Sequence, residues 1–341
     1  MGCIIPTFTI QRDNMYIFDK IYGGFEVKEP VLQEIIKCKT FQRLANINMG
    51  SWTPQNPFLS TGYSRYEHSI GVFLLLRKYG ASIMEQIAGL IHDVSHTAFS
   101  HLSDRLFGNE GSAQTSEFQD SVHDDFVKNS EIAQILDRHG YDVTEILNDR
   151  NFPLKEKSLP DLCADRMDYG LRATVHMKRY GHMLDIDVEK LADSFIATET
   201  GFVMCDLDAA RRFAKTFNFA DEHIYSCFDN VFFEAMMADV CHDALACGVL
   251  RREDFWNLTD WQIIKKMSDS GTDFSKMYRT PSEWRADESD TTAQIEFQKV
   301  RRIDPLFVDT NGTIRRLSDV DTEYAEYLAG LPKYFEYKIK P

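Results

Sequence analysis

The chain has 341 residues, of which 43% are hydrophobic, so it is long enough for one large domain or two ordinary ones with a substantial core. It carries 53 acidic and 38 basic side chains, which leave a formal net charge of -15. An acidic protein surface is poorly suited to bind nucleic-acid phosphates, so nucleic acid is not expected as a partner. The basic pairs at 178–179 and 301–302 would allow nucleic-acid binding to be tested through its salt dependence.

Hydrophobic periodicity predicts a helical body in the first half of the chain. Apolar residues recur at about the 3.6-residue period of a helix, and Gly80 and Ser82 are suited to end one helix and cap the next. Two glycines and two prolines within 48–64 predict a loop. We expect helices over residues 31–47, 65–79, 83–91, 122–127 and 131–138.

The second half of the chain mixes helices with short hairpins. The stretch FIATETGFVM predicts a hairpin that turns at Gly201, and Asn311-Gly312 lies between strand-like runs as a two-residue hairpin signal. These elements together predict a mainly α fold with small β-hairpin elements toward the C-terminus. The further helices are expected over 161–181, from about 208, and over about 221–247.

Cysteine usage and the absence of long apolar runs bear on the compartment. The seven cysteines are scattered without CxxC pairs, which is typical of reduced thiols. No apolar run reaches the length of a membrane span, and the N-terminus lacks the pattern of a secretory signal. We therefore expect a cytoplasmic protein without a membrane partner.

The stretch LIHDVSHTAFSH, residues 90–101, places three histidines and an aspartate in an otherwise apolar helix. Buried polar side chains cost free energy unless each finds a partner, and imidazole with carboxylate suits divalent metals. His92 and Asp93 supply two candidate ligands. His68 in SRYEHSIGV and Asp165 in CADRMDY are the further candidates.

Each of these residues also has a plain structural interpretation. His68 alone would usually be a satisfied core or surface histidine, and Asp165 alone a salt-bridging or capping residue. His92 and His96 have the i, i+4 spacing of a zinc peptidase, but no glutamate follows His92, so an HExxH site is disfavoured.

The segments RYEHSIGV, IAGLIHDVSHTAFSH and ADRMDYGLRA resemble, in order and spacing, the motifs of the HD-domain metal-dependent phosphohydrolases. The resemblance extends from about Phe18 to Val240, and within this superfamily it favours the deoxynucleoside triphosphate triphosphohydrolases. It implies an HD-domain helical core over 1–250, with 251–341 as a C-terminal α+β extension packed on the core. Family members are commonly oligomeric, so a homo-oligomer is expected.

The resemblance also implies roles for individual residues around a metal-activated water. Such a ligand set suits Mn, Fe, Ni, Co or Mg. Which of these metals occupies it often depends on their availability. Arg43 is expected to organise the core or a subunit interface. The implied metal ligands are His68, His92, Asp93 and Asp165; the implied catalytic residues are His96, His101 and His123; the implied substrate-binding residues are Arg65, Arg166, Tyr169 and Tyr225.

The sequence departs from the dNTP-cleaving pattern where the substrate is recognised. Met49 and Ala173 replace the glutamine and aspartate that relatives use for the sugar 3′-hydroxyl, and NFADEHIY before Ser226 is acidic where relatives offer arginines. A dNTP triphosphohydrolase-like enzyme is the first expectation. The alternatives are a nucleoside monophosphatase or phosphodiesterase on the same site, or a catalytically weak nucleotide-sensing module.

Overall fold

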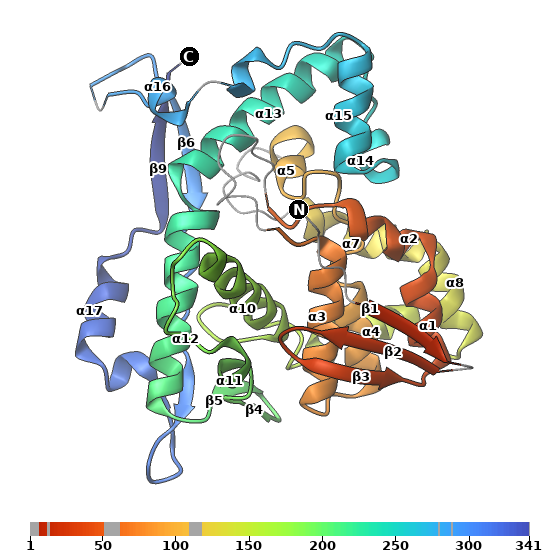
Figure 1. Ribbon diagram of the computed structural model, residues 1–341, viewed down its shortest axis with the longest axis vertical. Coiled ribbons are helices and arrows are strands. Elements are labelled where there is room, and N and C mark those ends of the chain that lie inside the picture. The colour runs from red at the N-terminus through yellow and green to blue at the C-terminus, as the bar shows by residue number, and fades with distance from the viewer. Residues whose placement is uncertain are drawn as a thin grey trace.

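The computed structural model describes residues 7–11, 14–50, 62–108, 118–278, 280–287 and 289–340. Helices form the body of the molecule, and the small sheets lie at its edges (Figure 1). The predicted mainly α fold is confirmed. Most of the loop predicted over 48–64 falls outside the described residues.

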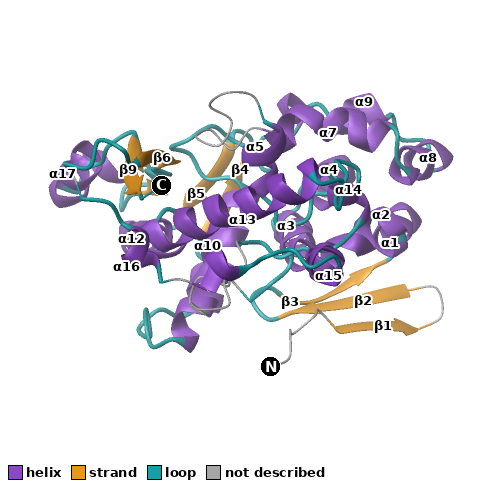
Figure 2. Ribbon diagram, turned by 90° about the horizontal axis from the view of Figure 1, so that it is seen from above, coloured by secondary structure: helices purple, strands orange, loops and turns teal. Residues whose placement is uncertain are grey.

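An N-terminal antiparallel sheet adds to the β elements expected from the sequence. It has the order β1-β2-β3, and Met15 and Ile17 of β2 are buried while Tyr16 and Phe18 are exposed, which is the alternation of a strand with one covered face. This sheet and the pair β6–β9 lie on opposite sides of the helical body (Figure 2). The strands are β1 Thr7–Gln11, β2 Asn14–Asp19 and β3 Gly23–Val27.

The single helix predicted over 31–47 is wrong, because the chain turns at Cys38. Cys38 has extended backbone angles, φ -70° and ψ 153°, and this turn lets Phe41 and Leu44 enter the core beside Ile35. The segment forms α1 Pro30–Lys37, α2 Lys39–Gln42 and the 3-10 turn η1 Arg43–Asn46.

The next two helices, α3 Arg65–Lys78 and α4 Ile83–Ile91, confirm the predictions over 65–79 and 83–91. Ser64 and Glu67 form a capping box at the start of α3, and the Ser82 hydroxyl accepts the Glu85 N–H at the start of α4. Every residue of α3 from Arg65 to Leu76 is buried, so this helix carries polar side chains into the centre of the molecule.

The middle of the chain is helical as expected, and the helix predicted over 122–127 begins earlier. In α12 the Asp206 carboxylate accepts the Ala209 N–H, which explains the start near residue 208. The helices are α5 Leu102–Phe107, α7 Phe118–Lys128, α8 Glu131–Arg138, α9 Val143–Ile146, α10 Ala164–Arg179, α11 Val188–Ala192 and α12 Leu207–Ala220.

The continuous helix predicted over 221–247 is wrong at its start. Residues Asp221–Tyr225 form a π-helical turn, and α13 Phe228–Ala246 begins only after Cys227, whose backbone is extended. The break follows from the buried Asp221 carboxylate, which accepts hydrogen bonds from the Ser226 hydroxyl and from the Arg301 backbone N–H.

Both predicted hairpins are present, and the second has a longer loop than expected. Residues 199–200 join β4 Phe195–Thr198 to β5 Gly201–Met204, whereas residues 309–313 join β7 Leu306–Val308 to β8 Ile314–Arg316. Asp309 stabilises this loop by accepting the N–H groups of Asn311 and Thr313. Strand β7 pairs in parallel with β5, so the C-terminal part adds strands to the β4–β5 hairpin.

The C-terminal part packs against α13 through an apolar cluster that includes Phe255, Ile263 and Met267. The division of the chain at residue 250 stays a prediction. Among the described residues, no helix combines the length and apolarity needed to cross a membrane. The elements are α14 Asp254–Asn257, α15 Asp260–Asp269, the 3-10 turn Ser275–Tyr278, α16 Pro281–Trp284, β6 Gln294–Lys299, α17 Thr322–Gly330 and β9 Tyr334–Ile339.

Candidate metal centre and active-site cavity

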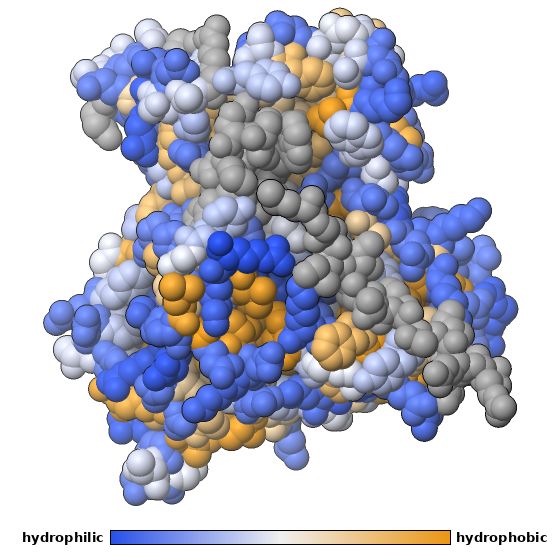
Figure 3. All heavy atoms as spheres, in the orientation of Figure 1, coloured by the Kyte–Doolittle hydropathy of each residue, from blue (hydrophilic) through white to orange (hydrophobic). Residues whose placement is uncertain are grey.

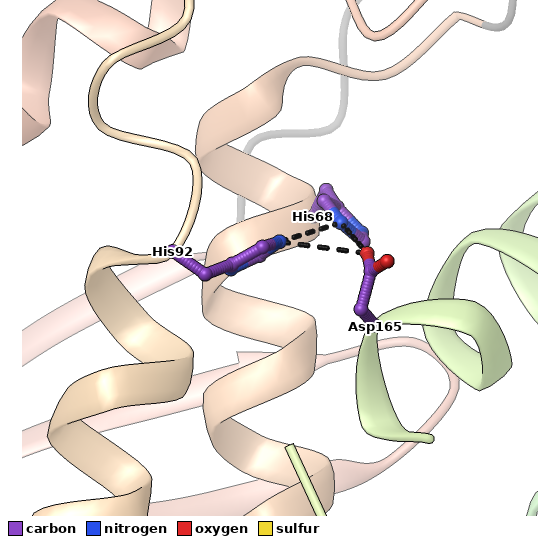
Figure 4. Close-up of side chains that lie close together, drawn as sticks. All are labelled: His68, His92 and Asp165. Carbon is purple, nitrogen blue, oxygen red and sulfur yellow. Dashed lines mark hydrogen bonds and ion pairs between the residues drawn. The ribbon is translucent and has the colours of Figure 1, made fainter. Parts of the chain in front are cut away.

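Three of the predicted metal ligands converge from three helices (Figure 4). His68 lies on α3, His92 follows the last residue of α4, and Asp165 lies in the first turn of α10. Asp165 Oδ1 is 2.8 Å from His68 Nε2 and 3.5 Å from His92 Nε2, and the two Nε2 atoms are 3.2 Å apart.

Hydrogen bonds orient both imidazoles so that their Nε2 atoms face one point. His92 Nδ1 donates to the Gly89 carbonyl at 2.7 Å, and His68 Nδ1 donates to Asp168 Oδ2 at 2.7 Å. Because a carbonyl and a carboxylate only accept, each Nδ1 carries a proton, and each ring in its neutral form offers the Nε2 lone pair. This orientation is the one that a metal-binding histidine requires.

The fourth predicted ligand, Asp93, lies beside these three but is also bound by arginine. Its carboxylate is 3.4 Å from His92 Nε2 and 3.8 Å from His68 Nε2, and Oδ2 accepts from Arg65 Nη1 at 2.8 Å. Burial opposes its ionisation, but Arg65 and the neighbouring histidines hold the pKa of Asp93 well below its usual range. Asp93 is therefore an anion, and its role as a ligand stays a prediction.

The donor set fits a divalent cation. The three converging donor atoms lie within 4.8 Å of one another, and ligands of one ion with bonds of about 2 Å are necessarily this close. Burial opposes a proton on His68, yet hydrogen bonds with Asp165 and Asp168 raise its pKa to about 9. The surroundings thus favour positive charge at this point, and two nitrogens with one or two carboxylates suit borderline or hard divalent ions.

The residue that orients His68 was not predicted from the sequence. Asp168 is fully buried and also accepts from the Tyr22 hydroxyl at 2.8 Å and from Arg172 Nε at 2.8 Å, while Arg172 Nη2 donates to Asp19 at 2.7 Å. Its i, i+3 spacing from Asp165 on one helix was the available signal. No local sequence pattern identifies Tyr22 as the partner of Asp168, or Asp19 as the partner of Arg172.

The three predicted catalytic histidines line one cavity with His92 and Asp165. His96 is buried with Nε2 3.3 Å from Asp93, and burial together with Arg65 lowers its pKa to about 3. Burial and nearby Lys155 lower the pKa of His123 to about 4, and its Nδ1 is 3.0 Å from the Ser95 hydroxyl. His101 is partly exposed, with Nδ1 3.2 Å from Asp104.

The cavity has a volume of about 710 Å3 and contains all four predicted substrate-binding residues. Arg65 donates to Asp93, the Ser100 hydroxyl and the Met49 carbonyl, and Arg166 donates to the carbonyls of Asp161 and Lys157. The rings of Tyr169 and Tyr225 meet edge to face at 5.8 Å. Four further cations of the lining were missed as site residues: Lys155, Lys157, Lys299 and Arg301.

The two positions that depart from the dNTP-cleaving pattern have different surroundings. Met49 lines the cavity, whereas Ala173 is buried in an apolar cluster with Met177, Ala220 and Ile224. Neither side chain can pair a sugar hydroxyl. Arg43, expected in the core or at an interface, donates to the carbonyls of Val94 and His96 and so supports the turn that carries the histidines.

Comparison with known proteins identifies the class of protein to which this chain belongs. A model of the HD domain matches residues 65–173. The uncharacterized protein YdhJ of Bacillus subtilis is 35% identical over 303 residues, which cover 86% of this chain and 89% of that protein. The metal-dependent phosphohydrolase cns2 of Cordyceps militaris is 29% identical over 275 residues, which cover 77% of each chain.

A solved structure has the same fold. The crystal structure of a phosphohydrolase from Bacteroides thetaiotaomicron superposes with a TM-score of 0.65 at 13% identity, over 96% of this chain and 100% of that one. With the site geometry, these likenesses establish that the chain belongs to the HD-domain metal-dependent phosphohydrolases. The resemblance to dNTP triphosphohydrolases is more distant, because the SAMHD1 homolog of Dictyostelium discoideum is 22% identical over 250 residues.

Proposed function

We propose that this phosphohydrolase acts on a nucleotide, with release of triphosphate from deoxynucleoside triphosphates as the first candidate reaction. The observation that carries the proposal is the cavity of about 710 Å3, which joins the predicted metal residues His92, Asp93 and Asp165 to basic and aromatic side chains. Phosphates need positive charge around the reacting phosphorus, and a base needs aromatic surface, so this lining suits a nucleotide.

The contacts of the individual residues support a division of roles. A divalent ion at His68, His92 and Asp165 would supply an activated water and neutralise charge on the reacting phosphate. Asp168 keeps the proton of His68 on Nδ1, so the other nitrogen stays available. Asp165 bears its negative charge, because its interactions with both histidines outweigh burial and lower its pKa.

The residues around this centre suit proton transfer and phosphate binding. His101 is partly exposed and paired with Asp104, which supports a role as proton donor to the leaving oxygen. Arg65 and Arg166 hold planar guanidinium groups at the cavity wall, where they can bind phosphate oxygens. Tyr169 provides ring surface for a base.

A second candidate is a nucleoside monophosphatase or phosphodiesterase on the same centre. It is favoured by Met49 and by the apolar surroundings of Ala173, since neither residue offers a hydrogen bond to a 3′-hydroxyl. An enzyme without this recognition would select its substrate by the phosphate arrangement or the base.

The test is release of phosphate, pyrophosphate and triphosphate from dNTPs, NTPs, monophosphates and phosphodiesters, each with Mn, Mg, Ni and Co. Asp165→Ala removes a proposed ligand, and Asp193→Ala removes an exposed carboxylate as the matched control. Triphosphate release that only Asp165→Ala abolishes supports the first candidate. Release from monophosphates or diesters alone supports the second, and no turnover of any substrate contradicts both and favours a nucleotide-sensing module.

A further inference from the structure

A short segment after β6 forms part of the cavity wall although it lies far along the chain from the metal residues. Lys299 ends β6, and Arg301 follows two residues later; both line the cavity that contains His92 and Asp165. The β6 strand lies beside α13 in Figure 1, and the segment then continues toward β7.

Hydrogen bonds to two different parts of the chain hold this segment in place. The Lys299 carbonyl accepts from the Ser226 hydroxyl at 3.3 Å, and the Arg301 N–H donates to Asp221 at 3.1 Å. Further along the segment, the Asp304 N–H donates to the Pro160 carbonyl at 3.0 Å, just before α10. The segment therefore has a fixed position between the π-helical turn and the start of the helix that carries Asp165.

The Arg301 guanidinium lies at the cavity wall and, within the described part of the chain, is held there by a single carboxylate, that of Asp221. Its Nη1 is 3.5 Å from Asp221 Oδ1, which is an ion-pair distance, and among the described residues this buried atom has no hydrogen-bond partner. An N–H group left unpaired in a protein interior costs free energy. Nη1 itself is not accessible, but the side chain is 20% exposed and lines the cavity, so a ligand there can contact its other atoms.

Two other basic residues of the wall, Arg65 and Lys155, are more fully engaged. Arg65 pairs with Asp93 at 2.8 Å, and Lys155 pairs with Asp149 at 2.5 Å. By contrast, no described residue forms an ion pair with the Lys299 ammonium within 4.0 Å. The Lys157 ammonium likewise has no ion pair with a described residue, so the capacity for an anion lies on the C-terminal segment and on Lys157.

We propose that Arg301, assisted by Lys299, binds a phosphate group of the substrate other than the one that is cleaved. This inference rests on the proposed nucleotide function and narrows it to nucleotides with more than one phosphate, such as nucleoside di- and triphosphates. Asp221 orients the Arg301 backbone and guanidinium, and the C-terminal segment supplies positive charge that the acidic residues before Ser226 do not.

The test is binding of two inorganic probes, tripolyphosphate and orthophosphate, to the full chain with Mn, measured by titration calorimetry. Arg301→Ala is compared with Arg302→Ala, which removes the same charge from the next residue, whose Nη2 donates to the Leu331 carbonyl outside the cavity lining. We expect Arg301→Ala to weaken tripolyphosphate binding about tenfold or more, because a charge-assisted contact is lost. Orthophosphate binding should change less than about twofold.

The outcomes separate this inference from the proposed function, because binding is measured without turnover. Unchanged tripolyphosphate affinity in Arg301→Ala, or an equal loss in Arg302→Ala or for orthophosphate, would overturn it. If Arg301→Ala does not fold, Lys299→Ala replaces it: weaker tripolyphosphate binding with unchanged orthophosphate binding supports the proposal, and unchanged binding of both contradicts it. Arg301→Lys should restore part of the lost affinity.

Discussion

The two ring nitrogens of His68 contact different partners and have different roles. Nδ1 donates to Asp168, which is also bound by Tyr22 and Arg172, while Nε2 faces Asp165 and His92. The fixed Nδ1 proton keeps the Nε2 lone pair directed at the proposed metal position. Asp168 thus influences metal binding without contacting the metal position itself.

We expect Asp168→Asn to weaken Mn binding by about 10- to 100-fold, because the amide cannot accept all three hydrogen bonds and lacks the charge beside His68. Loss of this charge next to buried Arg172 should also lower the free energy of unfolding by about 3 kcal/mol. Calorimetric Mn titration and urea unfolding measure the two effects. The control is Tyr22→Phe, which removes one hydrogen bond to Asp168 and should leave Mn affinity nearly unchanged; equal affinities in all three proteins would contradict the role.

At the scale of elements, α3 and α10 approach closely where α3 has a glycine. A Cβ atom on Gly71 would lie 2.0 Å from Asp168 Oδ1 and 2.2 Å from Arg172 Nη2. The absence of a side chain therefore makes room for the buried carboxylate that orients His68. Helix packing and site geometry depend on the same residue.

We expect Gly71→Ala to lower the free energy of unfolding by about 2 kcal/mol or more, since the methyl group must displace a buried ion pair. Gly330→Ala is the control, because no atom lies within 4 Å of its added Cβ, and its effect should stay within about 0.5 kcal/mol. Urea unfolding of both variants measures this difference. Equal free energies of unfolding in the two variants would show that α10 can move away from α3 without destabilising the protein.

A second link between elements is Asp260, the first residue of α15. Its carboxylate accepts from the N–H groups of Asn48 and Phe99 at 2.9 and 2.7 Å. Phe99 has a φ of 61°, which is unfavourable for a residue with a side chain, so this contact stabilises the strained end of the histidine-bearing segment. The C-terminal part thereby supports the candidate site.

Asp260 also predicts a pH dependence of stability. Burial, only partly offset by its hydrogen bonds, raises its pKa to about 6, so the folded protein binds a proton that the unfolded chain releases near pH 4. The free energy of unfolding should fall by roughly 3 kcal/mol as the pH rises from about 4 to about 6, and this contribution should be constant above that. Urea unfolding of the wild type and Asp260→Asn across this range isolates the effect; parallel profiles would refute it.

At the scale of the whole molecule, the candidate site draws on residues from both ends of the chain. Tyr22 belongs to the N-terminal region, and Lys299 and Arg301 belong to the C-terminal segment. The visible surface is mostly hydrophilic, with hydrophobic side chains gathered in several areas, the most prominent in the centre of the lower half (Figure 3). Homo-oligomerisation stays a prediction.

Because the proposed ligands come from α3, α4 and α10, metal binding should stabilise the whole fold. At a free Mn concentration of 100 times Kd, the free energy of unfolding should rise by about 2.7 kcal/mol. For a chain of this size, this corresponds to an increase in Tm of roughly 4 °C, which a chelator should reverse. Thermal unfolding should show the shift in Asp193→Ala but not in Asp165→Ala; a shift retained without Asp165 would place the metal elsewhere.

Local patterns in the sequence determined the helical fold class, the capped starts of α3 and α4, both hairpins, and the residues that converge in Figure 4. Periodicity, caps and motif spacing concern neighbouring residues, so they are present before the chain folds. The tertiary structure alone decided the breaks at Cys38 and Ser226, the pairing of Tyr22 with Asp168, and the approach of Arg301 to the cavity. These features depend on which distant segment supplies the partner of a buried polar group, and no short-range spacing specifies that partner.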